Sequence, residues 1–460
     1  MVDEASDSLI HEQVSFCIRT VDDSLIINED FISLYETPNT ESQTLFIILK
    51  DIFARLDLSM DNLRGQCYDG ASNMSVEDSL RHLTSMRDIM ALAKDLINTV
   101  RESNKRMGLF RTIRYESAND QAGLRPLCPT RWTMRASSIS RILKNFEELL
   151  EFFETFSVED KTEAGYKCAG YRESMFQFKT YFFLRLYCHA MNPVENVNEK
   201  IQSPHLSVAD LENIYEGLIC ILKGRRDSFE NFWELCLKEK PSQVEPPSLP
   251  RKRRIPKKYE NNESSSSSPH TFKTLKEYYK ALYIEVCETV QSCITERFAS
   301  TGLTEVIAVE QECLLLVNRG ETNFEKSTEF FKSDLDIERL CLLLNMLADI
   351  ANKKKLVLKN MRDVRKYIIQ EPAVGEMLCK VVKCIKLLQV VPITTATSER
   401  SFSGLKRLKS YLRSTMGQKR LNNLAVLHAH RDVLDELDIR PVINDFIFTN
   451  SVRRSTFAPF

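Results

Sequence analysis

Residues 63–74 read LRGQCYDGASNM, and this stretch decides how the N-terminal part of the chain is interpreted. Its first half, Leu63–Tyr68, predicts a short strand, and the Asp-Gly pair that follows is a common turn. Toward the N-terminus, Val14–Thr20 and Ile26–Tyr35 predict two strands of a hairpin, and Glu41–Leu56 carries a helical stripe of apolar residues. The order strand, strand, helix, strand predicts a mixed sheet with a helix against it.

Beyond residue 75 the apolar residues are spaced almost wholly as in helices. The segment Lys240–His270 interrupts this pattern, because it combines five prolines between Pro241 and Pro256 with a basic run and a serine run. Such a composition buries too little apolar area to offset the entropy of ordering, so we predict a disordered loop there. The predicted fold class is α+β and predominantly α-helical.

Composition limits what the chain can be. Of its 460 residues, 43% are apolar and 28% are charged, which is typical of a soluble globular protein. The formal net charge is −1, so a DNA-binding surface would have to be a local patch. The 13 cysteines have no framework spacing, which favours reduced thiols in a nuclear or cytosolic protein. No apolar run is long enough to span a bilayer, so we expect no membrane contact.

Two apolar stripes near the C-terminus predict a pair of helices. The first helix is expected to start around Thr395–Ser398, at the stretch TSERSFS of residues 397–403, and the second follows Met416-Gly417. Together they predict an αα-hairpin whose apolar faces need a partner surface, either on a second chain or within the same chain. The stripe residues are Phe402, Leu405, Leu408 and Leu412 in the first helix and Leu421, Leu424 and Leu427 in the second.

Three stretches resemble hAT-family transposases, in the branch related to the MYM-type zinc finger proteins. They are residues 2–7 (VDEASD), residues 63–74, and residues 397–403 with their continuation YLRSTM at 411–416. Residues 128–132, CPTRW, look like the family's Cys…Arg-Trp element. The resemblance extends over nearly the whole chain.

The resemblance implies an incomplete RNase H-like fold interrupted by a large all-α insertion. Residues 1–75 would form the N-terminal part of the RNase H-like core. Residues 76–387 would form the helical insertion, with the disordered loop at about 240–270. Residues 388–460 would form the hAT C-terminal dimerisation region and complete the core.

The resemblance also places a catalytic triad at Asp3, Asp69 and Glu399, which would hold Mg²⁺ or Mn²⁺ in an active member. Hard divalent cations prefer carboxylate oxygens, and in phosphodiester chemistry they activate the attacking oxygen and stabilise the leaving one. Each residue also has a plainer interpretation. Asp3 is then a solvated acidic terminus, Asp69 is part of a turn, and Glu399 is a carboxylate in the first turn of a helix.

Three departures from the family pattern predict that catalysis is lost. The family has a longer apolar strand before the residue that matches Asp3, so we expect a damaged platform for that carboxylate. No Cys/His spacing suits the family's N-terminal zinc finger. After Ser75 the family continues into another strand, whereas Val76 starts directly on helical sequence. A missing strand leaves unpaired backbone groups on its neighbour and disturbs the positioning that catalysis needs.

Other residues point to DNA and to the nucleus. Trp132 beside Arg131 is suited to stacking on a base, or else to the core. The basic run Arg251–Arg254 with Lys257-Lys258 fits a nuclear-import signal, or else a solvated loop. The predicted DNA-binding residues are Arg131, Trp132, Arg400, Lys406, Arg407, Lys409 and Arg413.

The sequence leaves three functions open. The first is a non-catalytic, transposase-derived nuclear protein that self-associates through its C-terminal region, as a homodimer or a hAT-type heterodimer. The second is an active DNA transposase that cleaves DNA and transfers strands with a divalent metal. The third is a fragmentary gene product without a selected role. DNA is a possible partner under the first two, and no small-molecule substrate is expected.

Overall fold

The fold is given by a computed structural model. It describes residues 1–6, 12–39, 41–67, 80, 82–127, 135–201, 208–249, 272–299, 303–319, 333–392, 395–409 and 416–457. The chain forms two compact units. Unit 1 joins the two ends of the chain, Met1–Asp69 and Val309–Phe460, with the short piece Ser203–Val208. Unit 2 comprises Gly70–Gln202 and Ala209–Ala308. The domain boundaries predicted at residues 75 and 387 stay predictions.

Unit 1 is built on a three-stranded antiparallel sheet in the order β1-β2-β3. The strands are β1 (Val2–Ser6), β2 (Glu12–Val21) and β3 (Ile27–Thr37), so the predicted hairpin is confirmed. β1 pairs with β2 along its whole length, from Val2 opposite Phe16 to Ser6 opposite Glu12, with one strand residue before Asp3. The damaged platform expected at Asp3 stays a prediction.

Both faces of this sheet are covered, which is why β2 is buried almost continuously. Val14 and Phe16 face α1 (Ser42–Arg55), while Cys17 and the β3 residue Leu34 pack against two C-terminal helices. A β-bulge lies in β3 opposite Phe16 and Cys17. The extra residue shifts the alternation of side chains, so that residues three apart in β3 point to the same face.

The predicted strand Leu63–Tyr68 is not formed over residues 63–67, which is a correction to the sequence-based topology. The segment runs beside the edge of β1, where the Val2 N–H donates to the Cys67 carbonyl over 2.9 Å. The short 3-10 helix η1 (Met60–Asn62) precedes it. A side chain at Gly65 would meet the Pro392 ring at 2.8 Å, so the approach of this segment to residues 391–392 requires glycine.

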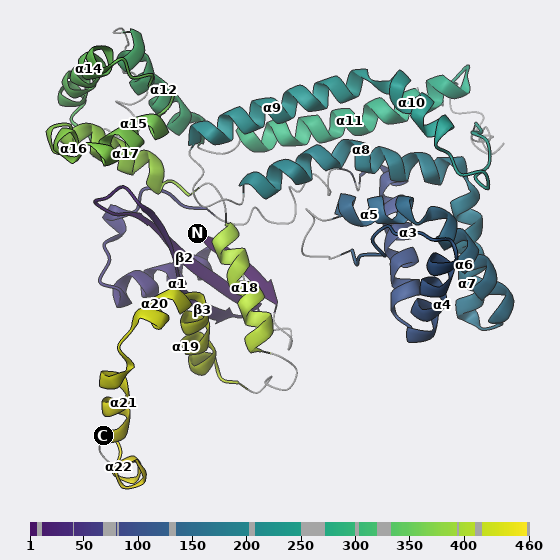
Figure 1. The fold of residues 1–460 in the computed structure, drawn as a ribbon, viewed down its shortest axis with the longest axis horizontal. Coiled ribbons are helices and arrows are strands. Elements are labelled where there is room, and N and C mark those ends of the chain that lie inside the picture. The colour runs from purple at the N-terminus through teal and green to yellow at the C-terminus, as the bar shows by residue number, and fades with distance from the viewer. Residues whose placement is uncertain are drawn as a thin grey trace, which may run out of the picture. The chain divides into compact units, whose positions relative to one another are not determined.

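The remaining helices of unit 1 come from the C-terminal half. Figure 1 shows α18 and α19 lying over the sheet, and the last two helices carrying the chain away from it toward the C-terminus. Their bounds are α12 (Leu303–Arg319, which starts in unit 2), α14 (Ile337–Lys354), α15 (Met361–Gln370), α16 (Pro372–Met377), α17 (Cys379–Val390), α18 (Ala396–Leu408), α19 (Gln418–Ala429), α20 (Arg431–Glu436), α21 (Ile439–Phe448) and α22 (Ser451–Thr456).

The regular elements described in unit 2 are all helices, and they enclose a large apolar core that is rich in aromatic rings such as Phe182 and Trp233. The chain breaks between two of its helices at Asn145, whose buried amide donates to the Arg141 carbonyl over 2.7 Å. Its helices are α3 (Thr84–Arg101), α4 (Asn104–Glu116), α5 (Arg135–Lys144), α6 (Phe146–Glu159), α7 (Glu163–Phe176), α8 (Phe178–Ile201), α9 (Val208–Asp227), α10 (Phe229–Lys238) and α11 (Leu275–Ala299).

The predicted loop at about 240–270 is described over its first ten residues only. There Val244 is buried in the core of unit 2, and the Glu245 N–H donates to the Phe176 carbonyl over 2.8 Å. The basic run Arg251–Arg254 lies outside the described residues. Across the part of the chain that is described, no helix is both long and apolar enough to cross a membrane. The predicted fold class, α+β and mainly helical, is confirmed.

Candidate functional site

Asp3 lies on β1 with its side chain directed toward α18. It stands opposite Ser15 in the sheet register, and the Ser15 hydroxyl is 2.7 Å from the hydroxyl of Ser401 on α18. Side chains directly opposite in an antiparallel pair share a face of the sheet, so Asp3 is on the face that α18 covers. Only 5% of Asp3 is exposed, and its carboxylate accepts the Glu4 N–H over 2.8 Å. It is therefore a buried residue and not a solvated terminus.

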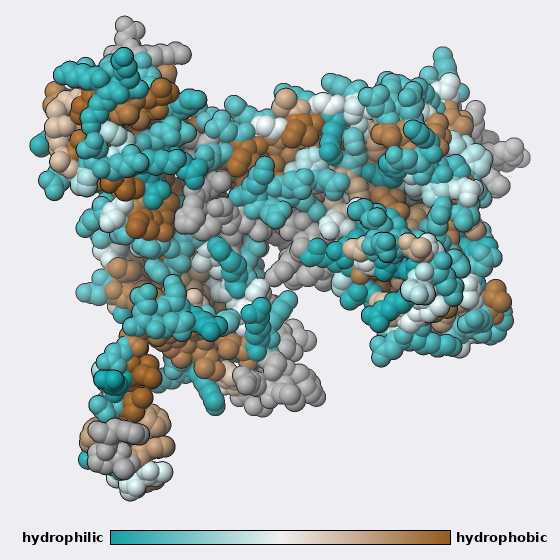
Figure 2. All heavy atoms as spheres, in the orientation of Figure 1, coloured by the Kyte–Doolittle hydropathy of each residue, from teal (hydrophilic) through white to brown (hydrophobic). Residues whose placement is uncertain are grey.

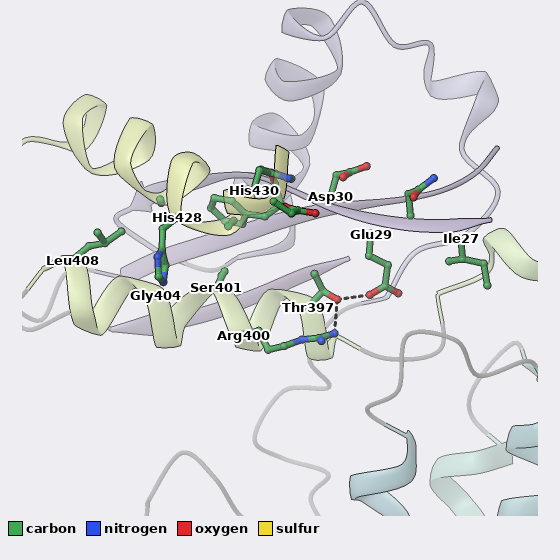
Figure 3. A pocket seen from close by; sticks show the side chains of 15 residues that line it. Ile27, Glu29, Asp30, Thr397, Arg400, Ser401, Gly404, Leu408, His428 and His430 are labelled. Carbon is green, nitrogen blue, oxygen red and sulfur yellow. Dashed lines mark hydrogen bonds between the residues drawn. The ribbon is translucent and has the colours of Figure 1, made fainter. Parts of the chain in front are cut away.

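Glu399 lies in the first turn of α18 and is exposed. Successive helical residues are about 100° apart, so Glu399 leaves the helix on a different flank from Arg400, which points toward β3 (Figure 3). Since α18 also contacts β1, the elements that carry Asp3 and Glu399 lie side by side. Asp69 lies outside the described residues, although the segment that leads to it borders β1 at Cys67.

These positions bear on the metal that an active transposase would need. Carboxylate oxygens are the ligands that Mg²⁺ and Mn²⁺ prefer. Among the residues that the structure describes, no group of three His, Cys, Asp or Glu side chains is placed to hold a metal ion. Asp3 and Glu399 are two of the three predicted ligands, and the described residues alone do not make a metal site.

A pocket of about 470 Å³ opens between β3, α18 and α19. Figure 3 shows Glu29, Thr397 and Arg400 at one end of it and Gly404 with His428 toward the other. At this second end α18 and α19 are closely packed, because a side chain at Gly404 would meet the His428 ring at 2.8 Å. Helix α18 lines the pocket with Thr397, Arg400, Ser401, Gly404 and Leu408, and Glu399 is not among the lining residues.

A buried ion pair fastens the C-terminal helices to the sheet. The Arg19 guanidinium on β2 is 2.6 Å from the Glu29 carboxylate on β3, and both side chains are almost fully buried. Arg19 also donates to the Gln389 carbonyl at the end of α17, over 2.8 Å. Glu29 accepts the hydroxyl of Thr397, which in turn accepts a hydrogen bond from Arg400. Residues about 370 positions apart thus share one polar network, which we call the sheet clamp.

The edge of β3 is closed by α19. The Leu34 N–H donates to the Asn422 side chain over 3.1 Å, and the Leu34 carbonyl accepts from Gln418 over 2.8 Å. His430 reaches the Phe31 carbonyl over 2.8 Å. An exposed strand edge would leave such backbone groups unpaired and open to other chains. Here the helix that follows Gly417 satisfies them.

The sheet and the C-terminal helices packed on it both match known protein families. Residues 1–79 match the family described as "ZMYM1/FAM200, RNase-like domain", and residues 380–433 match the "hAT family C-terminal dimerisation region". The chain carries an RNase-like domain and a hAT dimerisation region. The sheet clamp and the α19 contacts are therefore the joint between them.

Short stretches also resemble curated proteins. Over 66 residues the chain is 36% identical to the Mus musculus protein named 52 kDa repressor of the inhibitor of the protein kinase, which covers 14% of this chain and 9% of that protein. Over 55 residues it is 40% identical to the Homo sapiens protein of the same name, which covers 12% of this chain and 7% of that protein. The aligned stretch spans less than a tenth of either relative.

Three of the seven predicted dimerisation residues lie inside the joint with the RNase-like domain. Phe402, Leu405 and Leu421 are buried against Cys17 and Leu34 of the sheet. Burial raises the pKa of the Cys17 thiol, which stays a neutral core side chain. The other predicted dimerisation residues that the structure describes are less buried. Leu408 and Leu424 are half-buried, and Leu427 is exposed. Leu412 lies outside the described residues.

The predicted DNA-binding residues are divided in the same way. In the hAT region Arg400, Lys406 and Arg407 are at the surface, whereas Lys409 is only 5% exposed. The remaining three, Arg131, Trp132 and Arg413, lie outside the described residues. Sequence reasoning missed the sheet clamp. Its only signal was an Arg and a Glu on neighbouring predicted strands, a pattern that surface ion pairs share.

Proposed function

We propose that this hAT-derived protein self-associates through residues 388–460 and does not act as a transposase. One observation carries the proposal: the hAT region folds as two complete helices that are hydrogen-bonded to the RNase-like sheet, with basic and apolar side chains left on its outer surface. Such a surface supports either a homodimer or a heterodimer with another hAT-type protein, because burial of apolar area drives association.

Self-association is tested on the full chain by sedimentation velocity over a range of concentrations from nanomolar to about 50 µM. We expect a species of twice the 53.2 kDa chain mass to dominate as concentration rises. A single 53.2 kDa species throughout the range would contradict the proposal. Adding DNA in a parallel series separates protein-driven association from association on a shared DNA.

Loss of catalysis is supported by the state of Asp3. Its carboxylate is buried and accepts a backbone N–H, whereas a metal-binding carboxylate must present its oxygens to a cation that also contacts the phosphate. The competing proposal, an active metal-dependent transposase, draws support from the convergence of β1, the segment before Asp69 and α18. Its Mg²⁺ or Mn²⁺ would be held by Asp3, Asp69 and Glu399.

A nicking assay on supercoiled DNA decides between these two proposals. The full chain is compared with Asp69→Asn and Glu399→Gln in Mg²⁺ and then in Mn²⁺. We expect equal and negligible nicking by all three proteins. Metal-dependent nicking by the unaltered chain that Asp69→Asn abolishes would establish the transposase instead.

We also propose that the protein acts in the nucleus, with the basic run Arg251–Arg254 and Lys257-Lys258 as its import signal. A fluorescent fusion of the full chain is expected to concentrate in the nucleus. Replacing these basic residues by alanine should redistribute it to the cytoplasm. Nuclear concentration of both fusions would contradict the assignment of the signal.

A further inference from the structure

An apolar stripe runs along α21 and is only partly covered by the described residues of its own chain. Ile439, Val442, Ile443 and Phe446 recur at three- and four-residue steps, and each is between 41% and 59% exposed. Figure 2 shows the stripe as a brown band near the C-terminal end. Single exposed apolar residues are ordinary, but one helix face made of four of them marks an interaction surface.

The helix that carries the stripe is held in a defined shape. Ile447 is buried, while Asn450 caps α22, which packs back on α21. The Arg453 guanidinium lies 4.0 Å from the centre of the Phe446 ring. Arg454 donates to the Phe448 carbonyl over 2.6 Å. We call α20, α21 and α22 together the C-terminal arm.

Continuity in sequence indicates what covers the stripe. The match to the hAT dimerisation region ends at residue 433, inside α20, and the stripe begins six residues later. The apolar surface therefore extends the region that the comparison assigns to dimerisation. A surface that continues a self-association region is most simply buried by a second copy of the same chain.

Charge points to the surface that receives the arm. Residues 431–445 hold five acidic side chains and two basic ones. The exposed charges of α18 and α19 have the opposite sign, because Arg400, Lys406, Arg407, Lys419 and Arg420 are exposed and Glu399 is the single acid in these two helices. Complementary charge of this kind steers two surfaces together and fixes their register.

We propose that the C-terminal arm of one copy docks on the basic α18–α19 surface of a second copy, with the α21 stripe buried in the contact. In a two-fold dimer each chain gives its arm and receives the other's, so the same contact occurs twice. This inference rests on the proposed self-association and names the surface that produces it. The proposed contact includes residues 434–457, which lie beyond the match to the hAT dimerisation region.

The first test is Val442→Asp, with Val357→Asp as its matched control. Val357 is also in unit 1, is even more exposed at 74%, and lies outside the arm. We expect Val442→Asp to weaken the dimer at least tenfold in sedimentation velocity, and Val357→Asp to leave it unchanged. Both variants should keep the circular dichroism and melting temperature of the unaltered chain, because both side chains are at the surface.

The second test reverses charge on each side of the contact. The double variant Lys406→Glu with Arg407→Glu and the double variant Asp435→Lys with Glu436→Lys should each self-associate poorly. Mixed together, they should restore a dimer across the reversed contact. A chain that dimerises equally well with Val442→Asp, or a mixture that fails to restore the dimer, overturns the arm contact but leaves self-association standing. A chain that is monomeric without any substitution overturns both.

Discussion

Arg19 and Glu29 form an ion pair 2.6 Å long whose side chains are 3% and 6% exposed. Removing one partner of a buried pair leaves the other charge without compensation, which costs about 3–5 kcal/mol. We expect Glu29→Gln to destabilise unit 1 by that amount and to release α18 from the sheet. Hydrogen exchange of the β2 amides in the full chain measures the loss directly.

Two control variants test whether burial of the Arg19–Glu29 pair causes the loss of stability. Asp23→Asn removes an exposed pair with Lys386 at the same 2.6 Å, and we expect no measurable change in exchange. The double variant Arg19→Met with Glu29→Leu should recover part of the stability, since apolar side chains can replace a buried pair. Equal losses from Glu29→Gln and Asp23→Asn would mean that burial does not govern the clamp.

Gly65 is predicted to resist substitution because its backbone approaches Pro392. In Gly65→Ala the new methyl group would lie 2.8 Å from the proline ring and 3.5 Å from the Val391 Cα, so one of the two segments must move. Overpacking of this kind costs about 1–3 kcal/mol. A suitable control is Gly217→Ala inside α9, where the methyl group meets nothing within 4 Å and helix propensity favours alanine. The melting temperature should fall for Gly65→Ala and should not fall for Gly217→Ala.

Phe402 and Leu427 were both predicted as stripe residues of the C-terminal helix pair. Truncating each of them should change the stability of the protein by different amounts. Phe402 is buried under the sheet, so Phe402→Ala should cost about 3–5 kcal/mol and loosen the joint. Leu427 is 46% exposed, so Leu427→Ala should change stability by less than about 0.5 kcal/mol. Chemical denaturation followed by circular dichroism separates the two. Similar effects from both truncations would show that α18 and α19 are not packed as described.

Unit 2 should lose stability in mild acid because of His189. Burial lowers its pKa from 6.5 to about 4, and its Nε2 is 3.0 Å from the Tyr283 hydroxyl. Above pH 6.5 the imidazole is neutral in both states and contributes no pH dependence. Between pH 6.5 and 4 only the unfolded chain takes up the proton, so the free energy of unfolding falls as pH falls, by at most about 1.4 kcal/mol per pH unit.

The His189 effect is measured as a difference between the unaltered chain and His189→Gln. Both tryptophans, Trp132 and Trp233, belong to the range of unit 2, so their fluorescence follows the unfolding of that unit. We expect the stability curves of the two proteins to converge as pH drops from 6.5 to 4. Parallel curves over that range would show that His189 is not held neutral by the fold.

The hairpin of β2 and β3 and the start of α18 were predictable because local patterns specify them. Apolar side chains recur at strand or helix spacing there, and Thr395 to Ser398 was the expected start of a helix that begins at Ala396. The predicted strand at Leu63–Tyr68 failed for a local reason as well. Over residues 63–67 the segment meets β1 through the hydrogen bond from the Val2 N–H to the Cys67 carbonyl, and Gly65 is needed for contact with Pro392.

The candidate site was only partly accessible from sequence. Asp3 and Glu399 were found through a family motif, and the structure puts their two elements in contact. The burial of Arg19 and Glu29 could not be foreseen, because it depends on Gln389 and Thr397, about 370 residues away. The stripe on Phe402 and Leu405 had the right period, but periodicity does not say which surface covers it.

Because unit 1 is assembled from both ends of the chain, synthesis order matters to its folding. The sheet leaves the ribosome first, while α18 and α19 follow only after about 360 further residues, a delay of roughly tens of seconds at ordinary elongation rates. During that interval Cys17, Phe31 and Leu34 face water, and the β3 edge has no helix to close it. A nascent or prematurely terminated chain thus exposes an unpaired strand edge that chaperones and other nascent chains can bind. In the finished protein, α19 closes this edge.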